Sequence, residues 1–222
     1  ENEIAQSKCS FGQEFANYWI HSGLLKISGE KMSKSLGNFA RIKDLLKIYH
    51  PEVIKFFLIS SHYRSALDFT NESLEQAKSG LTRIYESIDE KLILKENDDM
   101  DKGFVKDFEL AMNDDLNTPK AISIIFEIVK KINVENDYSI KRRLVTTLKK
   151  LANIFGLLNE KPELFFKYGS DVDAQLIEEM ILKRNQARKD KDFDKADKIR
   201  DELKSLGIIL DDKVDGTKWK KV

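Results

Sequence analysis

The stretch NESLEQAKSGLTRIYESI, residues 71–88, decides the fold of the chain. Its apolar residues recur three or four positions apart and form one stripe: Leu74, Ala77, Leu81, Ile84, Tyr85 and Ile88. This spacing places them on one face of an α-helix, so the stretch predicts a helix that buries that face against other helices. Helical periodicity continues to Asn159 and predicts a bundle of three to five helices. Thr118-Pro119 supplies a cap and a first-turn proline for one of them.

The helical pattern is interrupted once within the bundle and again at its end. Glu96 to Asp101 is acidic and aperiodic, which indicates a solvated connection between helices. Further breaks at Lys161-Pro162 and Tyr168-Gly169-Ser170 predict the last domain boundary. Beyond it, helical spacing predicts two more helices, and Gly207 is expected to end the second. The residues at this spacing are Leu176, Ile177, Met180, Ile181 and Arg184 in the first and Phe193, Ala196, Ile199, Leu203 and Leu206 in the second.

Both ends of the chain add short strands to this helical pattern. Ile208-Ile209-Leu210 and Thr217-Lys218-Trp219 flank an Asp215-Gly216 turn and predict a β-hairpin. Near the start, Leu24 to Ile27 predicts a strand that leads into a turn at Gly29. Two helices are expected on either side of Pro51, with apolar faces made by Ile42, Leu45, Leu46 and Tyr49 and by Val53, Ile54, Phe57 and Leu58.

The composition narrows the class of protein. The 38 basic and 38 acidic residues cancel, so only local charge can attract a nucleic acid. Cys9 is the single cysteine, which fits a reducing compartment. No apolar run approaches the roughly 20 residues of a membrane span. The chain opens on Glu1 without an initiator Met or a secretory signal, so we expect a cytoplasmic chain that starts within a longer protein.

Lys31-Met32-Ser33-Lys34-Ser35, the lysine-serine loop, carries the clearest chemistry. Its two lysines lie three residues apart between Gly29 and Gly37, so both ammonium groups can move onto a triphosphate while the serine hydroxyls donate further hydrogen bonds. Such groups would neutralise a leaving diphosphate during adenylate formation. The alternative for so short a motif is a solvated basic surface loop.

Gly29 to Asn38 resembles the KMSKS signature of class I aminoacyl-tRNA synthetases, with its usual glycine and asparagine after it. Other stretches are similar to cysteinyl-tRNA synthetases specifically, and together they cover essentially the whole chain: residues 1–7, 18–23, 57–65, 114–119 and 187–201. The resemblance implies that Lys34, with Lys31, stabilises the transition state, and that Lys31, Met32, Ser33, Lys34 and Ser35 bind ATP. It also implies ATP with Mg²⁺, cysteine and cysteine tRNA as substrates, and we expect a monomer.

The resemblance implies a mostly α fold: the edge of a class I (Rossmann-type) catalytic domain, a helical bundle and a small α+β domain that ends in a β-hairpin. We expect the first domain, with the loop, at 1–65, the bundle at 66–168 and an anticodon-binding domain at 169–222.

The family's zinc site is expected only in part. Cysteinyl-tRNA synthetases hold one zinc ion with two cysteines, a histidine and a glutamate, and soft sulfur on zinc selects the cysteine substrate. Glu3 matches the glutamate, whereas the other three ligands would precede residue 1. Cys9 matches no ligand position and is expected to be a plain thiol. The family's HIGH motif for ATP phosphates is also missing, so these 222 residues alone are expected to be inactive.

The C-terminal region carries the RNA-reading candidates. Lys183 to Arg200 holds eight basic and four acidic residues, and Arg188, Asp197 and Arg200 lie close in sequence, which is the mix that reads unstacked bases. The resemblance implies that Arg188, Asp197 and Asp212 read the anticodon, and we add Arg200 as a tRNA contact. Phe193 is either a stacking residue or core, and core is favoured; Trp219 is either a surface stacker or a cover for the last helix. Lys141 to Lys150 is either a phosphate contact or a solvated helix face.

Two other functions fit parts of the pattern. One is a cysteine ligase of low-molecular-weight thiol biosynthesis, which shares the catalytic half but lacks the anticodon region. The other is a non-catalytic tRNA-binding fragment. The segment from Arg188 to Trp219 argues against the first, and the complete lysine-serine loop argues against the second.

Overall fold

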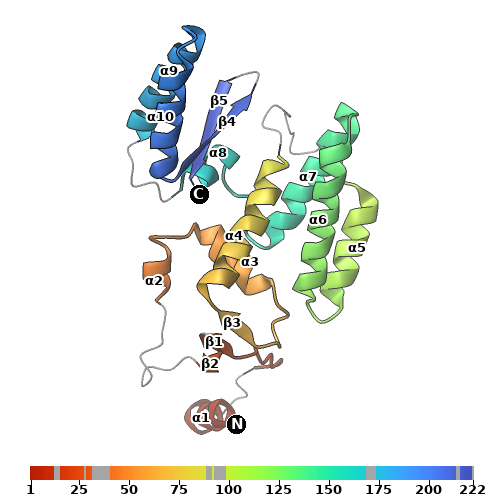
Figure 1. Cartoon of the computed structure of the whole chain (residues 1–222). Helices are drawn as coiled ribbons and strands as arrows, with labels where there is room; N and C mark the ends of the chain where they lie inside the picture. The colour runs from red at the N-terminus through yellow and green to blue at the C-terminus, as the bar shows by residue number, and fades with distance from the viewer. Residues whose placement is uncertain are drawn as a thin grey trace.

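The computed structural model describes residues 1–12, 16–27, 29–31, 41–88, 92, 99–168, 174–213 and 216–221. The chain is mostly helical, as predicted, and Figure 1 shows the α9 to β5 region set beside the bundle. None of the described helices is long and apolar enough to cross a membrane. The elements are α1 (Asn2–Phe11), β1 (Leu25–Ile27), β2 (Glu30–Lys31), α2 (Ile42–Leu45), α3 (Pro51–Ile59), β3 (Leu67–Phe69), α4 (Asn71–Glu86), α5 (Lys102–Asn113), α6 (Thr118–Val134), α7 (Tyr138–Ile154), α8 (Pro162–Lys167), α9 (Ala174–Lys189), α10 (Phe193–Ser205), β4 (Ile208–Lys213) and β5 (Gly216–Lys221).

A small mixed sheet lies at the N-terminal side, in the order β2-β1-β3. β1 is the predicted strand, and it pairs antiparallel with β2. It also pairs in parallel with β3, with Leu25 opposite Leu67 and Ile27 opposite Phe69. The sequence did not predict β3, because the place of this strand depends on its parallel pairing with the distant β1. Because parallel strands need a crossover connection, the lysine-serine loop, α2 and α3 all lie between β1 and β3 in the chain.

The helices around Pro51 differ from the prediction in two respects. α2 ends at Leu45, and residues 46–48 form a turn, so the expected helix does not reach Tyr49. In α3, Phe56 is buried, whereas Leu58 is 52% exposed. The prediction for Leu58 was wrong because it follows the exposed Lys55 by three residues and shares its solvent-facing side.

The bundle helices α4 to α7 each begin at a polar cap. Thr70 and Ser73 form a capping box for α4, and Asp101 and Asp137 cap α5 and α7. The cap of α6 is Asn117, whose Oδ1 accepts a hydrogen bond from the backbone of the third helical residue, so the assignment of the cap to Thr118 was one residue out. The Thr118 side chain is occupied elsewhere, because its hydroxyl donates to the Ser61 carbonyl at 3.4 Å.

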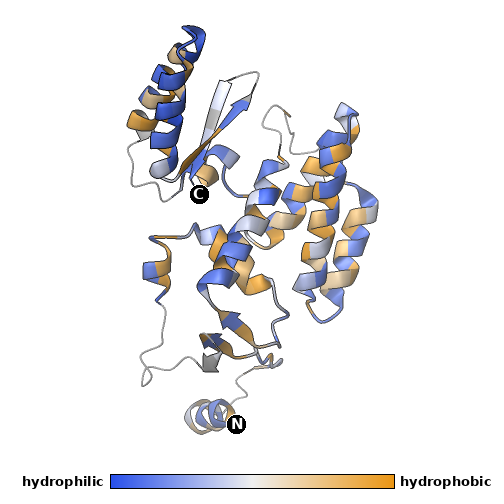
Figure 2. Cartoon of the chain, viewed as in Figure 1, coloured by the Kyte–Doolittle hydropathy of each residue, from blue (hydrophilic) through white to orange (hydrophobic). Residues whose placement is uncertain are grey.

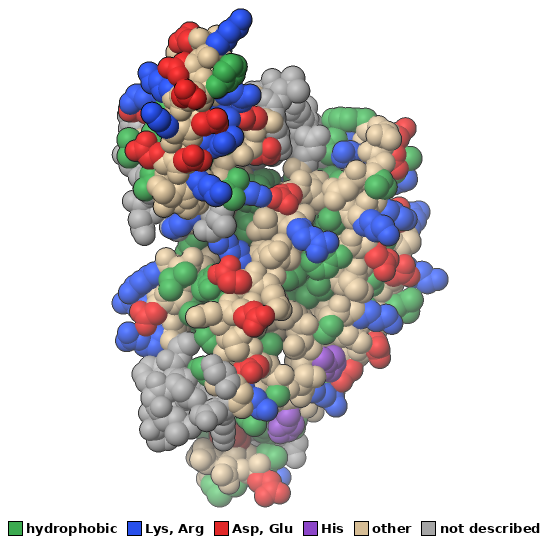
Figure 3. Space-filling view, viewed as in Figure 1, with side chains coloured by type: hydrophobic (Ala, Val, Ile, Leu, Met, Phe, Trp, Pro, Cys, Tyr) green, Lys and Arg blue, Asp and Glu red, His purple; other side chains and the backbone are tan. Residues whose placement is uncertain are grey.

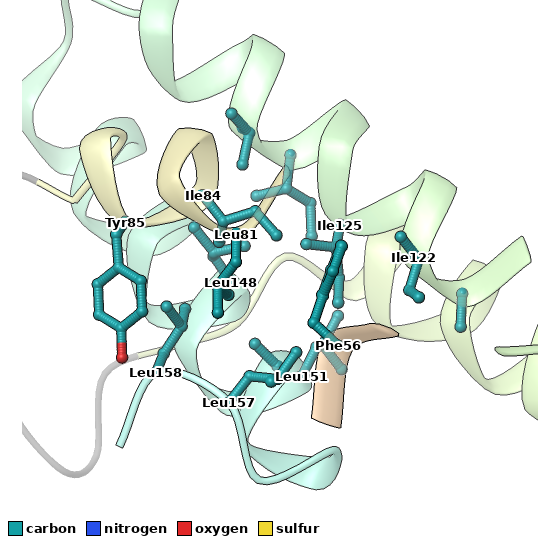
Figure 4. Close-up of a cluster of buried hydrophobic side chains, with 14 of the residues drawn as sticks. Phe56, Leu81, Ile84, Tyr85, Ile122, Ile125, Leu148, Leu151, Leu157 and Leu158 are labelled. Carbon is teal, nitrogen blue, oxygen red and sulfur yellow. The ribbon is translucent and has the colours of Figure 1, made fainter. Parts of the chain in front are cut away.

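One hydrophobic core joins α3 to the bundle. Figure 4 shows side chains of α3, α4, α6, α7 and the segment that follows α7 pointing toward one another: Phe56, Leu81, Ile84, Tyr85, Ile122, Ile125, Leu148, Leu151, Leu157 and Leu158. Every residue of the predicted α4 stripe is buried except Ile88, which packs against the core from a half-buried position. Figure 2 shows hydrophobic residues along the bundle helices, whereas α9 and α10 are mostly hydrophilic.

A buried carboxylate fastens the end of the bundle to α3. Glu52 is only 3% exposed, and its Oε2 accepts hydrogen bonds from the Tyr85 hydroxyl and the Leu158 backbone N–H, both at 2.8 Å. Its Oε1 accepts from the Asn159 backbone N–H at 3.0 Å. Burial, together with the Glu52 contact, raises the pKa of the Tyr85 hydroxyl well above its usual range. A buried carboxylate with this many donors is satisfied, and it ties α3, α4 and the segment after α7 together.

Candidate nucleic-acid interface

The helices α9 and α10 form a tight antiparallel pair. Lys191, in the turn between them, has a left-handed backbone with φ of +59°, and Asp192 caps α10 by accepting a hydrogen bond from the Lys195 backbone N–H at 3.1 Å. Gly207 has φ of +75° and donates to the Lys204 carbonyl, so it ends α10 as predicted. The chain then turns directly into β4.

The predicted β-hairpin is present, and one of its faces packs against α9 and α10. Alternation along β4 puts Ile208, Leu210 and Asp212 on the same face, and across the hairpin Leu210 is opposite Trp219 and Asp212 is opposite Thr217. The apolar end of this face forms a buried cluster with the helices: Ile177, Ile181, Leu203, Ile208 and Trp219. Asp212 continues the same face at the end next to the β4–β5 turn.

Trp219 is a cover for the helices and not a surface stacker. It is 5% exposed, and its indole Nε1 donates to Glu178 Oε1 at 2.9 Å. The Lys167 ammonium group lies 5.0 Å from the centroid of the indole ring, which is cation–π distance. These contacts hold the hairpin on α9 and α8.

Asp212 lies at the centre of a polar cluster, in contact with two arginines of α9. Arg184 donates through Nη1 to Oδ1 and through Nη2 to Oδ2, both at 2.7 Å, and Arg188 Nη1 donates to Oδ2 at 2.8 Å. Thr217 Oγ1 donates to Oδ1 at 2.8 Å. The pKa of the Asp212 carboxyl is therefore held well below its usual range, chiefly by the hydrogen bonds from Arg184. The Arg184 side chain is 7% exposed, whereas those of Arg188 and Asp212 are 50% and 40% exposed.

The four residues expected to contact RNA form two pairs. Arg188 and Asp212 form the pair above, and Asp197 Oδ1 lies 3.1 Å from Arg200 Nη2 on α10, with both side chains more than half exposed. The charge of Asp197 also raises the pKa of Arg184, after the larger effect of Asp212. Sequence reasoning missed Arg184 as a site residue, although its place four residues before Arg188 puts both on one face of α9.

Phe193 is 62% exposed, so the preference for a core position was wrong. It is the first residue of α10, while the apolar cluster packs against Leu203 near the other end of that helix. Helical spacing placed Phe193 on the same side of α10 as Ala196, but it could not show that the apolar cluster stops before the first residue of the helix. The exposed ring is compatible with the other expectation, a stacking residue, which stays a prediction.

Charges of both signs cover α9 and α10. Figure 3 shows Lys and Arg interspersed with Asp and Glu over this part of the surface. The Lys141–Lys150 stretch lies on a different element, α7, where Arg143 and Lys150 are exposed. The structure thus separates the two basic stretches that the sequence singled out.

The lysine-serine loop lies mostly outside the described residues, and Met32, Ser33, Lys34 and Ser35 all fall there. Its entry is described: β1 and β2 form a short antiparallel pair with Lys31 opposite Lys26. Gly29 joins the two strands with φ of +83°, and its backbone N–H donates to Asp68 Oδ1 at 3.0 Å. Glu3 lies in the first turn of α1 and is exposed. The described residues contain no group of three or more potential metal ligands.

Three separated segments converge beside this sheet. The Gly23 backbone N–H donates to the Tyr63 carbonyl at 2.6 Å, and a Cβ on Gly23 would lie 2.0 Å from the Ser65 carbonyl oxygen. The Tyr63 hydroxyl donates to Asp115 Oδ1 at 2.7 Å, and Arg64 Nε lies 3.1 Å from Asp115 Oδ2. These contacts hold the α5–α6 turn against residues 63–65, which in turn contact Gly23 just before β1.

Three protein-family models match the chain in succession. Residues 1–79 match the class I (C) tRNA synthetase catalytic domain, residues 107–159 the DALR domain, and residues 175–219 the cysteinyl-tRNA ligase anticodon binding domain.

Curated relatives and one solved structure extend these matches. Cysteine–tRNA ligases from Idiomarina loihiensis and Hydrogenovibrio crunogenus are 44% and 45% identical over 100% of this chain. The chain spans about half the length of these relatives, 48% of each. A crystal structure of a LeuRS–tRNA–LeuAMS complex from Agrobacterium radiobacter K84 matches 68% of this chain and 22% of that one with a TM-score of 0.51. At 14% identity, this last match supports the fold alone.

Proposed function

Because this chain belongs to the cysteine–tRNA ligase family, we propose that it provides the lysine-serine loop and the anticodon-reading part of such an enzyme. The whole enzyme would activate cysteine with ATP to cysteinyl-adenylate and transfer the cysteine to its tRNA, as a cytoplasmic monomer. The Arg184–Asp212–Arg188 cluster carries the proposal, since it lies in the segment that matches the anticodon binding model.

We propose that the loop acts on the leaving group of adenylate formation. The attack of the cysteine carboxylate on the α-phosphate releases diphosphate, bound to Mg²⁺, and its growing charge needs cations. Lys31 and Lys34 would supply two of them, with Ser33 and Ser35 donating hydrogen bonds. The Gly29–Asp68 hydrogen bond and the β1–β2 pair support a fixed hinge from which such a loop can close.

We do not propose that the 222-residue chain activates cysteine by itself. The sequence contains no HIGH tetrapeptide to hold the ATP phosphates, so we expect no cysteine-dependent ATP–pyrophosphate exchange from the 222 residues. The residues present also do not fit the family's zinc ion. Glu3 offers a single carboxylate, whereas zinc sites use three or four protein ligands, and we assign no step to zinc.

We propose that the cluster on α9, α10 and the β-hairpin reads the anticodon. Unstacked bases are recognised by stacking and by hydrogen bonds to their edges, which requires exposed rings and fixed donors. Phe193 supplies an exposed ring, and Arg188 supplies donors held by Asp212. The thiol-biosynthesis ligase is the weaker candidate, because it has no use for a segment that matches an anticodon binding domain.

The test is the affinity of this chain for cysteine tRNA, measured by fluorescence anisotropy against the same tRNA with another anticodon. Arg188→Ala and Asp197→Ala are each expected to weaken binding to cysteine tRNA and to lower this preference. Losing a hydrogen bond to a charged group costs about 1.5–3 kcal/mol, so each variant should lose about tenfold or more. Unchanged affinity and unchanged preference in both variants would sink the proposed base-reading role.

A further inference from the structure

We propose that a hollow lined by α4, α8, the end of β5 and the turn after α2 binds a phosphate group. The hollow has a volume of about 310 Å³, well above the roughly 10–15 Å³ that one water molecule needs, so it admits a group of several atoms. Neither the lysine-serine loop nor the Arg184–Asp212–Arg188 cluster contributes a residue to its lining. The phosphate belongs either to the backbone of an RNA or to a free ion, two sources that one experiment separates.

Cations from three separate parts of the chain line this hollow. Lys47 lies in the turn after α2, Lys78 lies on α4, and Lys220 and Lys221 lie at the end of β5. Among the described residues of the lining there is one carboxylate, that of Glu75. Four ammonium groups against one carboxylate leave an excess of three positive charges. Since the basic and acidic residues of the whole chain cancel, this excess is local and favours an anionic ligand.

Ion pairs with carboxylates outside the lining do not cancel this charge. Lys47 Nζ lies 3.3 Å from Asp44 Oδ1, and Lys220 Nζ lies 2.6 Å from Glu86 Oε1. Counting these two carboxylates as well still leaves one positive charge. Lys78 is half-buried, and within the described part of the chain its ammonium group forms no hydrogen bond or ion pair. This ammonium group is therefore available to a ligand.

The carboxylate of the lining has a partner of its own. Glu75 lies one helical turn before Lys78 on α4, but its Oε1 accepts a hydrogen bond from the Tyr49 hydroxyl at 2.9 Å. Tyr49 is 8% exposed, so the carboxylate is held against the wall of the hollow. The position that would otherwise neutralise Lys78 is thus occupied by a neutral hydroxyl.

The elements that carry the lysines are fixed to one another. The Tyr168 hydroxyl, just after α8, donates to the Leu46 carbonyl at 2.7 Å, next to Lys47. On the other side, the ion pair of Lys220 with Glu86 joins β5 to α4. Figure 1 shows α8 between the β4–β5 hairpin and α4. Cations that are already gathered in one place lose less freedom when a ligand binds, which favours binding.

Buried aromatic rings form part of the lining. His50 is 5% exposed, and its ring meets those of Phe165 and Tyr168 edge-on, with centroid distances of 5.1 and 4.7 Å. Such walls lower the local dielectric constant and strengthen the attraction between ammonium groups and an anion. Lysine ammonium groups are point charges that suit phosphate oxygens and lack the planar fork that reads a base edge. The contact should therefore be the same for every RNA sequence.

The first arm of the experiment measures the affinity of the 222-residue chain for cysteine tRNA and for the same tRNA with another anticodon. Lys78→Gln is expected to weaken the binding of both RNAs equally, by about fivefold, which is the upper range for a partly exposed ion pair. It should also reduce the salt dependence of log Kd by about one unit of slope. Lys78→Arg keeps the charge, and Lys106→Gln removes the charge of an exposed lysine on α5, so both should stay within about twofold of the wild type.

The second arm titrates inorganic phosphate and diphosphate into the chain by isothermal titration calorimetry. Because the lysine-serine loop could bind the same ions, this arm uses a chain that carries Lys31→Ala and Lys34→Ala. If the ligand is a free ion, binding persists in this background, and adding Lys78→Gln weakens it by about fivefold.

A loss in either arm that Lys78→Arg and Lys106→Gln do not share would support the inference and identify the source of the phosphate. Wild-type affinity of the Lys78→Gln chain in both arms would overturn it, and so would an equal loss in Lys106→Gln. A Lys78→Gln chain that binds one tRNA more weakly but not the other would also overturn it, because a phosphate contact does not depend on the anticodon. If the wild-type chain does not distinguish the two tRNAs and Lys78→Gln still weakens both, the proposed anticodon reading fails and this inference stands.

Discussion

Glu52→Ala is expected to be among the most destabilising single substitutions in the bundle. The change removes the acceptor of two buried donors, the Tyr85 hydroxyl and the Leu158 backbone N–H, and of the backbone N–H of Asn159, an exposed residue. The backbone groups cannot follow the receding side chain. Each buried donor left unsatisfied costs about 1–3 kcal/mol, so the free energy of unfolding should fall by about 4 kcal/mol.

Two milder variants and a control separate the contributions of the Glu52 hydrogen bonds to the free energy of unfolding. Tyr85→Phe removes one hydrogen bond and leaves Glu52 its backbone donors, so it should cost about 1 kcal/mol. Glu52→Gln keeps the shape but turns one acceptor into a donor that faces other donors, so it should lie between the two. Glu109→Ala changes an exposed glutamate on α5 and should remain within about 0.5 kcal/mol of the wild type.

The assay is urea unfolding followed by the helical circular dichroism signal, which the bundle dominates. At a slope of about 2 kcal/mol per molar, a loss of about 4 kcal/mol lowers the midpoint by about 2 M. The double variant of Glu52→Ala with Tyr85→Phe should lose less than the sum of the two, because both changes remove the same hydrogen bond. A midpoint for Glu52→Ala equal to that of Glu109→Ala would refute the reasoning.

Three further outcomes are expected. Trp219→Phe removes the hydrogen bond that the indole N–H donates to Glu178 and should destabilise the C-terminal unit by about 1 kcal/mol, measured by thermal unfolding. An unchanged melting temperature would mean that this bond contributes nothing to stability. Gly23→Ala forces a Cβ to 2.0 Å from the Ser65 carbonyl, so the chain should be markedly less stable to urea, and wild-type stability would show that this approach is looser than described. The pKa of Asp212 is lowered on folding, so its contribution to stability is fully present above about pH 4 and is lost as the pH falls through the lowered value. The difference in stability between wild type and Asp212→Asn should therefore be constant from pH 7 to about pH 5 and shrink below about pH 4, and a difference that changes near neutral pH would contradict this assignment.

The helices were predictable because burial imposes a period on the sequence. The stripe from Leu74 to Tyr85 is the core face of α4, and Gly207 lies where α10 ends, as the sequence predicted. The three-residue strand β3 was not predictable, because its place depends on a parallel partner 42 positions away in register, Leu25 opposite Leu67. Helical periodicity shows which face of a helix is buried, but it does not show how much of that face a neighbouring element covers.

The sequence named candidate residues for the site but not the contacts between them. Arg188 and Asp212 were each expected to read the anticodon, and the structure shows them in contact. The central arginine, Arg184, was overlooked because its partner lies 28 residues away on a strand. A charged residue is usually exposed, so Glu52 also gave no sign in the sequence that it is buried. The Arg184–Asp212 contact and the burial of Glu52 both depend on the register and packing of elements that are distant in the chain, and a single sequence does not reveal these.

The preference of the wild-type chain for the cysteine anticodon is the most direct test of the account. The measurement is the pair of dissociation constants for cysteine tRNA and for the same tRNA with one anticodon base replaced, at one fixed salt concentration because phosphate contacts depend on salt. The account predicts tighter binding of cysteine tRNA by about tenfold or more, the value of one or more fixed hydrogen bonds to a base. Equal affinity for the two RNAs would contradict it.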